Sequence, residues 1–326
     1  MAEITVRCRN YSGSYLRING DYQRTISKLS FIRAIITVGA QKYSDIVNFG
    51  WRGLFHRFGM GIAVLPFLEK RGSHLCLSPS FRSLDMSEKA AASYWYGMAF
   101  TKLVAESELS IPWLGHVDSL WARGVLQIMS GSRMRGDLAG RDAVGEWHVL
   151  EAKGRSNGYG NTLVATAKGQ AARVISINGR LPSTTSASIA RLDTTPISVL
   201  LDDPHDDNAK ESWKINKEEF FHEYYRVIIE YIEYYRQNNI ENYEGIEFIV
   251  APLYLYPLFY HAQQPLLIGL PKQIFDKPGI APSFMAEFAK LTEKKIKKEN
   301  RNNRDQDIGA DGILVAGYNI DWEESK

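Results

Sequence analysis

Residues 133–153 read Arg-Met-Arg-Gly-Asp-Leu-Ala-Gly-Arg-Asp-Ala-Val-Gly-Glu-Trp-His-Val-Leu-Glu-Ala-Lys, and this stretch predicts a β-hairpin. The residues Asp142-Ala-Val-Gly145 suit a type I turn that is closed by a glycine in the left-handed region. Such a turn pairs Asp142 with Glu146. Counting outward then pairs Gly140 with His148, Leu138 with Leu150, and Asp137 with Glu151.

This register brings three charged side chains together. Directly opposed residues of an antiparallel pair point to the same face, so Asp137 should lie beside Glu151. Side chains of one strand alternate between faces, so Lys153 shares the face of Glu151. Asp142 is the competing carboxylate, but it stands five positions along the strand, roughly 16 Å from Glu151. A bent strand would be needed to bring Asp142 to the same cation.

The second strand is apolar on both faces apart from His148 and Glu151, which is typical of a strand covered on both sides. A buried glutamate is costly unless it is paired. One explanation is a structural Glu–Lys pair where the strand emerges into solvent. The opposed Asp137 favours another explanation, a site for a divalent metal ion and a polarised water.

These residues resemble the PD-(D/E)xK nuclease superfamily, the fold of many restriction endonucleases and recombination nucleases. In that family an aspartate opens the second core strand and a Glu/Asp-x-Lys closes the third. Asp137, Glu151 and Lys153 match these positions, and Gly136 stands where the family often has a proline. The resemblance implies an α/β fold, with a restriction-endonuclease-like core of a mixed central sheet flanked by helices, plus N- and C-terminal additions.

A helix is expected after the hairpin, over residues 161–179, because small and apolar residues repeat there at helical spacing. Asn178-Gly179 would end it. Several branches of the superfamily carry a glutamine on this helix near the active site, and Gln170 matches that position. Val174 replaces the tyrosine that follows in one branch.

A second helix is expected upstream, from Ser87 to Glu108, packed beside the hairpin. Some members of the superfamily take a metal-binding glutamate from this helix. Glu106 and Glu108 are the candidates, and the alternative is a charge pair at the solvated end of the helix. His116 is a candidate for an upstream metal-binding histidine, and the alternative is a hydrogen-bonded structural residue.

The resemblance implies a metal-dependent phosphodiesterase. Asp137, Glu151 and the backbone carbonyl of Ala152 would bind Mg²⁺, with Mn²⁺ as a substitute, because these hard cations prefer oxygen ligands. Lys153 would neutralise developing charge or orient the water, and Gln170 would position the lysine or a phosphate. The expected catalytic residues are therefore Asp137, Glu151, Lys153 and Gln170.

Length and composition set the context. The chain has 326 residues, with 44% hydrophobic and 23% charged residues, which is ordinary for a globular protein. We expect residues 1–86 to extend or cover the core, 87–205 to form the nuclease core, and 206–326 to form a C-terminal α/β region packed on it. Two cysteines without metal-ligand spacing and the lack of a signal peptide favour a cytoplasmic protein, with no membrane partner.

The expected function is a nuclease that acts on DNA, with restriction or phage defence as the role typical of the fold. The net charge of only +2 is too small for the protein as a whole to attract nucleic acid. Any contact with phosphates must therefore come from a local basic surface. Cutting both strands would favour a homodimer. The main alternative is a degenerate member that binds nucleic acid or a protein partner without cutting. A third alternative is an unrelated α/β module with a coincidental hairpin.

Overall fold

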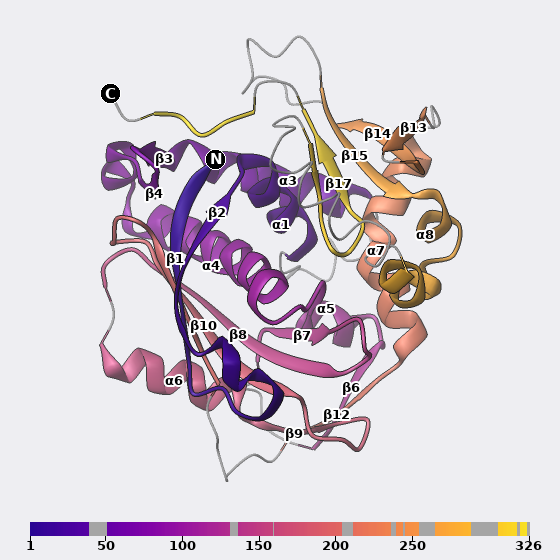
Figure 1. The fold of residues 1–326 in the computed structure, drawn as a ribbon, viewed down its shortest axis with the longest axis horizontal. Coiled ribbons are helices and arrows are strands. Elements are labelled where there is room, and N and C mark those ends of the chain that lie inside the picture. The colour runs from indigo at the N-terminus through magenta and orange to yellow at the C-terminus, as the bar shows by residue number, and fades with distance from the viewer. Residues whose placement is uncertain are drawn as a thin grey trace.

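The computed structural model describes residues 1–38, 51–130, 136–158, 160–203, 211–235, 239–243, 245–253, 265–287, 306–317 and 320–324. These residues form an α/β fold with a mixed, curled central sheet that is flanked by helices (Figure 1). The strand order is β3 (Leu68–Arg71), β4 (His74–Leu77), β1 (Ala2–Arg9), β11 (Ser198–Asp202), β10 (Thr184–Arg191), β8 (Trp147–Arg155), β7 (Leu138–Arg141) and β5 (Trp113–His116), and β2 (Gly20–Ile26) also pairs with β1.

The predicted hairpin is confirmed in β7 and β8. Gly145 has a φ of +92°, and its backbone N–H donates to the carbonyl of Asp142 at 3.2 Å, so the turn closes as expected. The antiparallel register pairs Leu138 with Leu150 and Gly140 with His148. On its other edge β8 pairs in parallel with β10, which makes it an interior strand.

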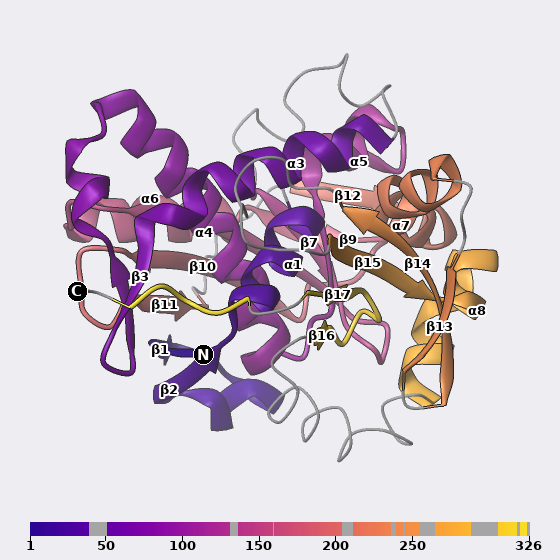
Figure 2. The same ribbon diagram turned by 90° about the horizontal axis from the view of Figure 1, so that it is seen from above.

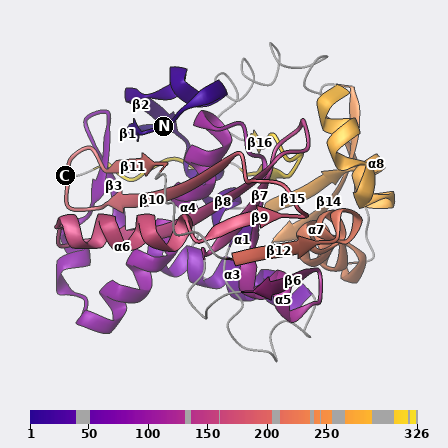
Figure 3. The same ribbon diagram turned by 90° about the horizontal axis from the view of Figure 1, so that it is seen from below.

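Helices cover both faces of β8 and β10. The helix α4 (Met86–Glu108) confirms the predicted helix beside the hairpin, and it begins with a capping box between Asp85 and Glu88. On the opposite face lies α6 (Asn161–Ala171), which packs on β10 and β8 (Figures 1 and 3). The helix α1 (Lys28–Val38) packs behind α4, and α3 (Trp51–Val64) packs on α1.

Two smaller sheets complete the fold. One contains β6 (Leu126–Ser130), β12 (Glu211–Ile215) and β9 (Val174–Ile177), and it lies beside α6 (Figure 3). The other contains β13 (Asn239–Tyr243), β14 (Ile246–Leu253), β15 (Leu266–Pro271), β17 (Leu314–Ala316) and β16 (Gln306–Ile308). This last sheet packs beside α7 (Lys217–Tyr234) and α8 (Lys272–Asp276), as Figure 2 shows.

Two predictions about the organisation of the chain can be compared with the observed helices and strands. The helix expected over residues 161–179 ends at Ala171, and Val174–Ile177 forms β9 instead, so the second half of that prediction is wrong. The first 86 residues supply β1 to β4 of the central sheet itself. The expected boundary at residues 205–206 lies outside the described residues. No helix in the described ranges has the length and apolarity needed to cross a membrane.

Candidate active site

The structure brings Asp137, Glu151 and Lys153 together at the open end of the hairpin. Lys153 Nζ donates a hydrogen bond to Glu151 Oε1, and it lies 3.8 Å from Asp137 Oδ2. Asp137 Oδ2 also accepts a hydrogen bond of 3.1 Å from the backbone N–H of Ala152. The side chains of Asp137 and Lys153 are about a quarter exposed, whereas Glu151 is fully buried, so solvent reaches the cluster from the aspartate and the lysine.

Glu151 is not satisfied by the groups around it. Its Oε2 atom is buried and has no hydrogen-bond partner in the described part of the chain. Burial, together with the negative charge of Asp137, raises the pKa of Glu151 from 4.5 to about 7, although Lys153 acts in the opposite direction. A buried carboxylate oxygen that lacks a partner, beside a second carboxylate, is suited to a bound cation.

The backbone of Ala152 fits the same site. The N–H and C=O groups of one strand residue point to the same side of the strand. Because the Ala152 N–H reaches Asp137, the Ala152 carbonyl points toward the Asp137 side as well. Two carboxylates and one carbonyl would thus form a partial oxygen shell, and water would complete the coordination of Mg²⁺.

Among the described residues, no group of three or more His, Cys, Asp or Glu side chains gathers to hold a metal.

The face of the sheet that carries the site is fixed by its neighbours. Gly154 faces α4, since a Cβ atom there would lie 1.8 Å from the carbonyl oxygen of Ser93. Thr101 of α4 donates a hydrogen bond to Ser188, the β10 partner of Ala152. Because side chains alternate, Glu151 and Lys153 point to the opposite face, which α6 covers.

Gln170 lies on that same side of the sheet. Ala167 and Ala171 form the buried seam of α6, and Lys168 and Gln170 flank this seam on opposite sides at roughly 100° per residue. Lys168 Nζ reaches Asp202 of β11 at 2.9 Å. Since β11 and β8 lie on opposite sides of β10, Gln170 is on the β8 side. Its side chain is half-buried, and the prediction of a positioning role is compatible with this placement.

Glu106 and Glu108 lie away from the site. Both are on α4, the opposite face of the sheet, and neither is at a solvated end as the sequence suggested. Glu108 forms two short hydrogen bonds with Arg24, at 2.6 and 2.8 Å. The interpretation as a charge pair at a solvated end is therefore wrong, because the side chains of Glu108 and Glu106 are only 3% and 14% exposed, although Arg24 reaches solvent.

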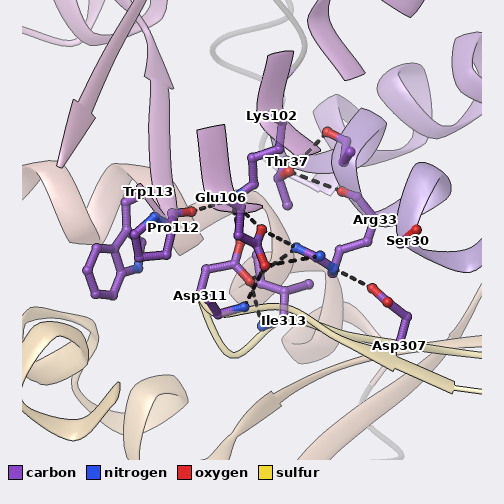
Figure 4. Close-up of polar contacts among 12 residues, drawn as sticks. Ser30, Arg33, Thr37, Lys102, Glu106, Pro112, Trp113, Asp307, Asp311 and Ile313 are labelled. Carbon is purple, nitrogen blue, oxygen red and sulfur yellow. Dashed lines mark hydrogen bonds and ion pairs between the residues drawn. The ribbon is translucent and has the colours of Figure 1, made fainter. Parts of the chain in front are cut away.

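Glu106 belongs to a buried ionic network (Figure 4). It accepts a hydrogen bond of 2.9 Å from Arg33 Nη1 and lies 3.4 Å from Lys102 Nζ. Lys102 also contacts Asp311 at 3.0 Å, and Arg33 contacts Asp307 at 2.5 Å. Burial alone would raise the pKa of Glu106, but the two cations outweigh it and lower the pKa to about 2. This network joins α1 and α4 to β16 and the turn that follows it.

His116 and Asp142 have structural contacts elsewhere. His116 pairs with Leu138 in the sheet, so it shares a face with Leu138, opposite to Glu151. Its Nδ1 accepts a hydrogen bond from the backbone N–H of Asp118 and so caps α5 (Val117–Ala122). Asp142 accepts a hydrogen bond of 2.7 Å from the backbone N–H of Glu146 in the hairpin turn, at the end of the hairpin away from Glu151.

Gly136 has a steric reason to replace a proline. A Cβ atom at this position would lie 2.7 Å from Val149 Cγ1. Any larger residue would push the chain away from β8 just before Asp137. Neither this requirement nor the Lys168–Asp202 pair that orients α6 could be predicted from the sequence, because both depend on residues that are distant in sequence.

Comparison of the chain with family models, with curated proteins and with solved structures found no match. The geometry of the site therefore carries the functional argument.

Proposed function

We propose that this protein is a metal-dependent nuclease of the PD-(D/E)xK type, which hydrolyses phosphodiester bonds in DNA. The observation that supports the proposal best is the convergence of Asp137, Glu151 and Lys153 on one face of an interior strand. The buried Oε2 of Glu151, with no partner in the described residues, adds to it. Most buried polar atoms of folded proteins do have a partner, so such an atom beside a second carboxylate supports a bound ligand.

Each residue of the site would have a separate role in hydrolysis. Bound Mg²⁺ would supply an acidified water and neutralise charge on the phosphoryl oxygens. Asp137, Glu151 and the Ala152 carbonyl would hold the ion. The ammonium of Lys153 would donate to a phosphoryl oxygen as negative charge develops there. The amide of Gln170 would orient the lysine or the phosphate from α6.

A nuclease panel tests the proposal. Purified protein with Mg²⁺ or Mn²⁺ is offered linear duplex, circular duplex, single-stranded DNA and RNA. Wild type should cut at least one substrate, and Lys153→Ala should cut it at least about a hundredfold more slowly, as is usual when one group that stabilises transition-state charge is removed. Lys214→Ala is the matched control, because Lys214 is an exposed lysine on β12.

Two further measurements make the panel decisive. Circular dichroism and thermal unfolding should show that Lys153→Ala keeps the wild-type fold. Equal cutting by wild type and Lys153→Ala would contradict the nuclease proposal, since it would indicate a contaminating nuclease. Mg²⁺ binding in calorimetry without any cutting would instead favour a degenerate member that binds nucleic acid or a protein partner.

A further inference from the structure

Two arginines stand side by side at the end of the strand that carries the site. Arg155 of β8 and Arg191 of β10 are direct partners in the parallel register. Neighbouring strands are only about 4.8 Å apart. Like charges in directly opposed positions destabilise a sheet. Asp193 offsets part of this charge at Arg191, and an anion that also binds Arg155 would offset the rest.

The arginine pair shares its face with the candidate active site. Gly154 and Ala190 are partners between these strands, and Gly154 faces α4. Arg155 and Arg191 are each the next residue along, so both side chains point to the face of Glu151 and Lys153. The Cα atom of Arg155 lies roughly 7 Å beyond that of Lys153. The pair therefore continues the line of the site along β8.

The contacts of the two arginines differ in a useful way. Arg191 forms a two-point ion pair with Asp193, through Nη2 at 3.0 Å and Nε at 3.3 Å, which orients its guanidinium group. Arg155 is exposed and donates one hydrogen bond of 3.3 Å to the carbonyl of Gly154. Within the described ranges, no carboxylate forms an ion pair with Arg155. One arginine is thus held in place, and the other can turn toward a ligand.

We propose that Arg155 and Arg191 bind the backbone phosphate next to the scissile one. This inference rests on the proposed nuclease function and specifies its substrate as a polynucleotide strand. That strand would run from Asp137 and Glu151 toward the C-terminal ends of β8 and β10. Planar guanidinium groups bind phosphate oxygens through paired hydrogen bonds, which suits two arginines that share one phosphate.

The salt dependence of binding tests this directly. A fluorescently labelled DNA duplex is titrated in EDTA with wild type, Arg155→Ala, Arg191→Ala and the double variant, between 50 and 200 mM NaCl. Because the two arginines share one phosphate, the double variant should reduce the slope of log K against log salt by about 0.9 on duplex, or about 0.7 on a single strand, and each single variant by less. Arg155→Lys should keep the wild-type slope, because it keeps the charge.

Arg17→Ala is the matched control. Arg17 is an exposed arginine in η1 (Gly13–Ile18), whose Tyr15 packs against His148 at the other end of β8. It should leave the salt slope unchanged. An unchanged slope in the double variant, or no binding by wild type, overturns the inference.

The salt slope needs neither metal nor cutting, so the two proposals fail separately. Cutting by wild type with an unchanged slope in the double variant refutes only the phosphate contact. A reduced slope without any cutting refutes only the nuclease.

Discussion

Replacing Glu151 with glutamine should stabilise the metal-free protein at alkaline pH. Burial and the charge of Asp137 raise the pKa of Glu151 from 4.5 to about 7. The difference between about 7 and 4.5, at about 1.4 kcal/mol for each pKa unit, corresponds to about 3 kcal/mol. This is the free energy that the ionised form costs the folded state. Glutamine has nearly the same shape and no charge, so it removes the cost.

The sign of the pH dependence follows from proton release. Between pH 4.5 and 7 the folded state keeps the Glu151 proton that the unfolded state loses. The wild-type free energy of unfolding should therefore fall by up to about 3 kcal/mol as the pH rises through this window. The glutamine variant lacks this loss, so its advantage should be small near pH 4.5 and complete above pH 7.

Urea unfolding at pH 5, 6, 7 and 8 in EDTA measures this advantage. Glu233→Gln removes an exposed glutamate on α7 and corrects for the loss of one charge. A stability difference between Glu151→Gln and wild type that is the same at pH 5 and pH 8 would refute the reasoning. A variant that is less stable than wild type at pH 8 would do so as well.

Four further predictions concern charge and packing. In calorimetry at pH 9, Lys153→Met should lower the Kd for Mg²⁺ about tenfold, or about 1.4 kcal/mol, because the ammonium competes with the ion for the two carboxylates. The high pH keeps Glu151 ionised once the lysine that lowers its pKa is gone, and unchanged affinity would contradict the prediction. Gly154→Ala should destabilise the protein by about 3 kcal/mol, since its Cβ would lie 1.8 Å from a backbone oxygen of α4. Gly169→Ala, with nothing within 4 Å, should instead stabilise it by up to about 1 kcal/mol. Lys102→Met should cost about 3 kcal/mol in urea unfolding, because it removes the nearer of the two cations that neutralise buried Asp311 and leaves only Arg33, at 3.6 Å.

The features that could be predicted from the sequence depend on residues close together in the chain. The hairpin followed from one glycine and three turn residues, and its register followed from counting. The side chains that this register brings together, Asp137, Glu151 and Lys153, are in contact in the structure. The helix predicted from Ser87 to Glu108 also followed from local periodicity, and the structure has it over Met86–Glu108.

Long-range pairing decided the features that the sequence did not predict. Val174–Ile177 is a short apolar run that suits either a helix or a strand, and its pairing with β12 makes it a strand. Glu106 and Glu108 are paired with Arg33 and Arg24, which are more than 70 residues away in sequence. The arginine pair depends on the parallel register of β8 and β10, which no local signal specifies.

Two buried clusters of charge among the described residues differ in a way that makes one of them the candidate active site. In the network of Arg33, Lys102, Glu106, Asp307 and Asp311, every charge has an opposite charge in contact, and it ties distant elements together (Figure 4). Such a network stabilises one arrangement of the chain and has nothing left to bind. At Glu151, one carboxylate oxygen is buried without a partner in the described residues, and the pKa is raised rather than lowered. Strongly shifted pKa values cluster at functional sites, and under the proposed nuclease function the group that completes Glu151 is a divalent cation.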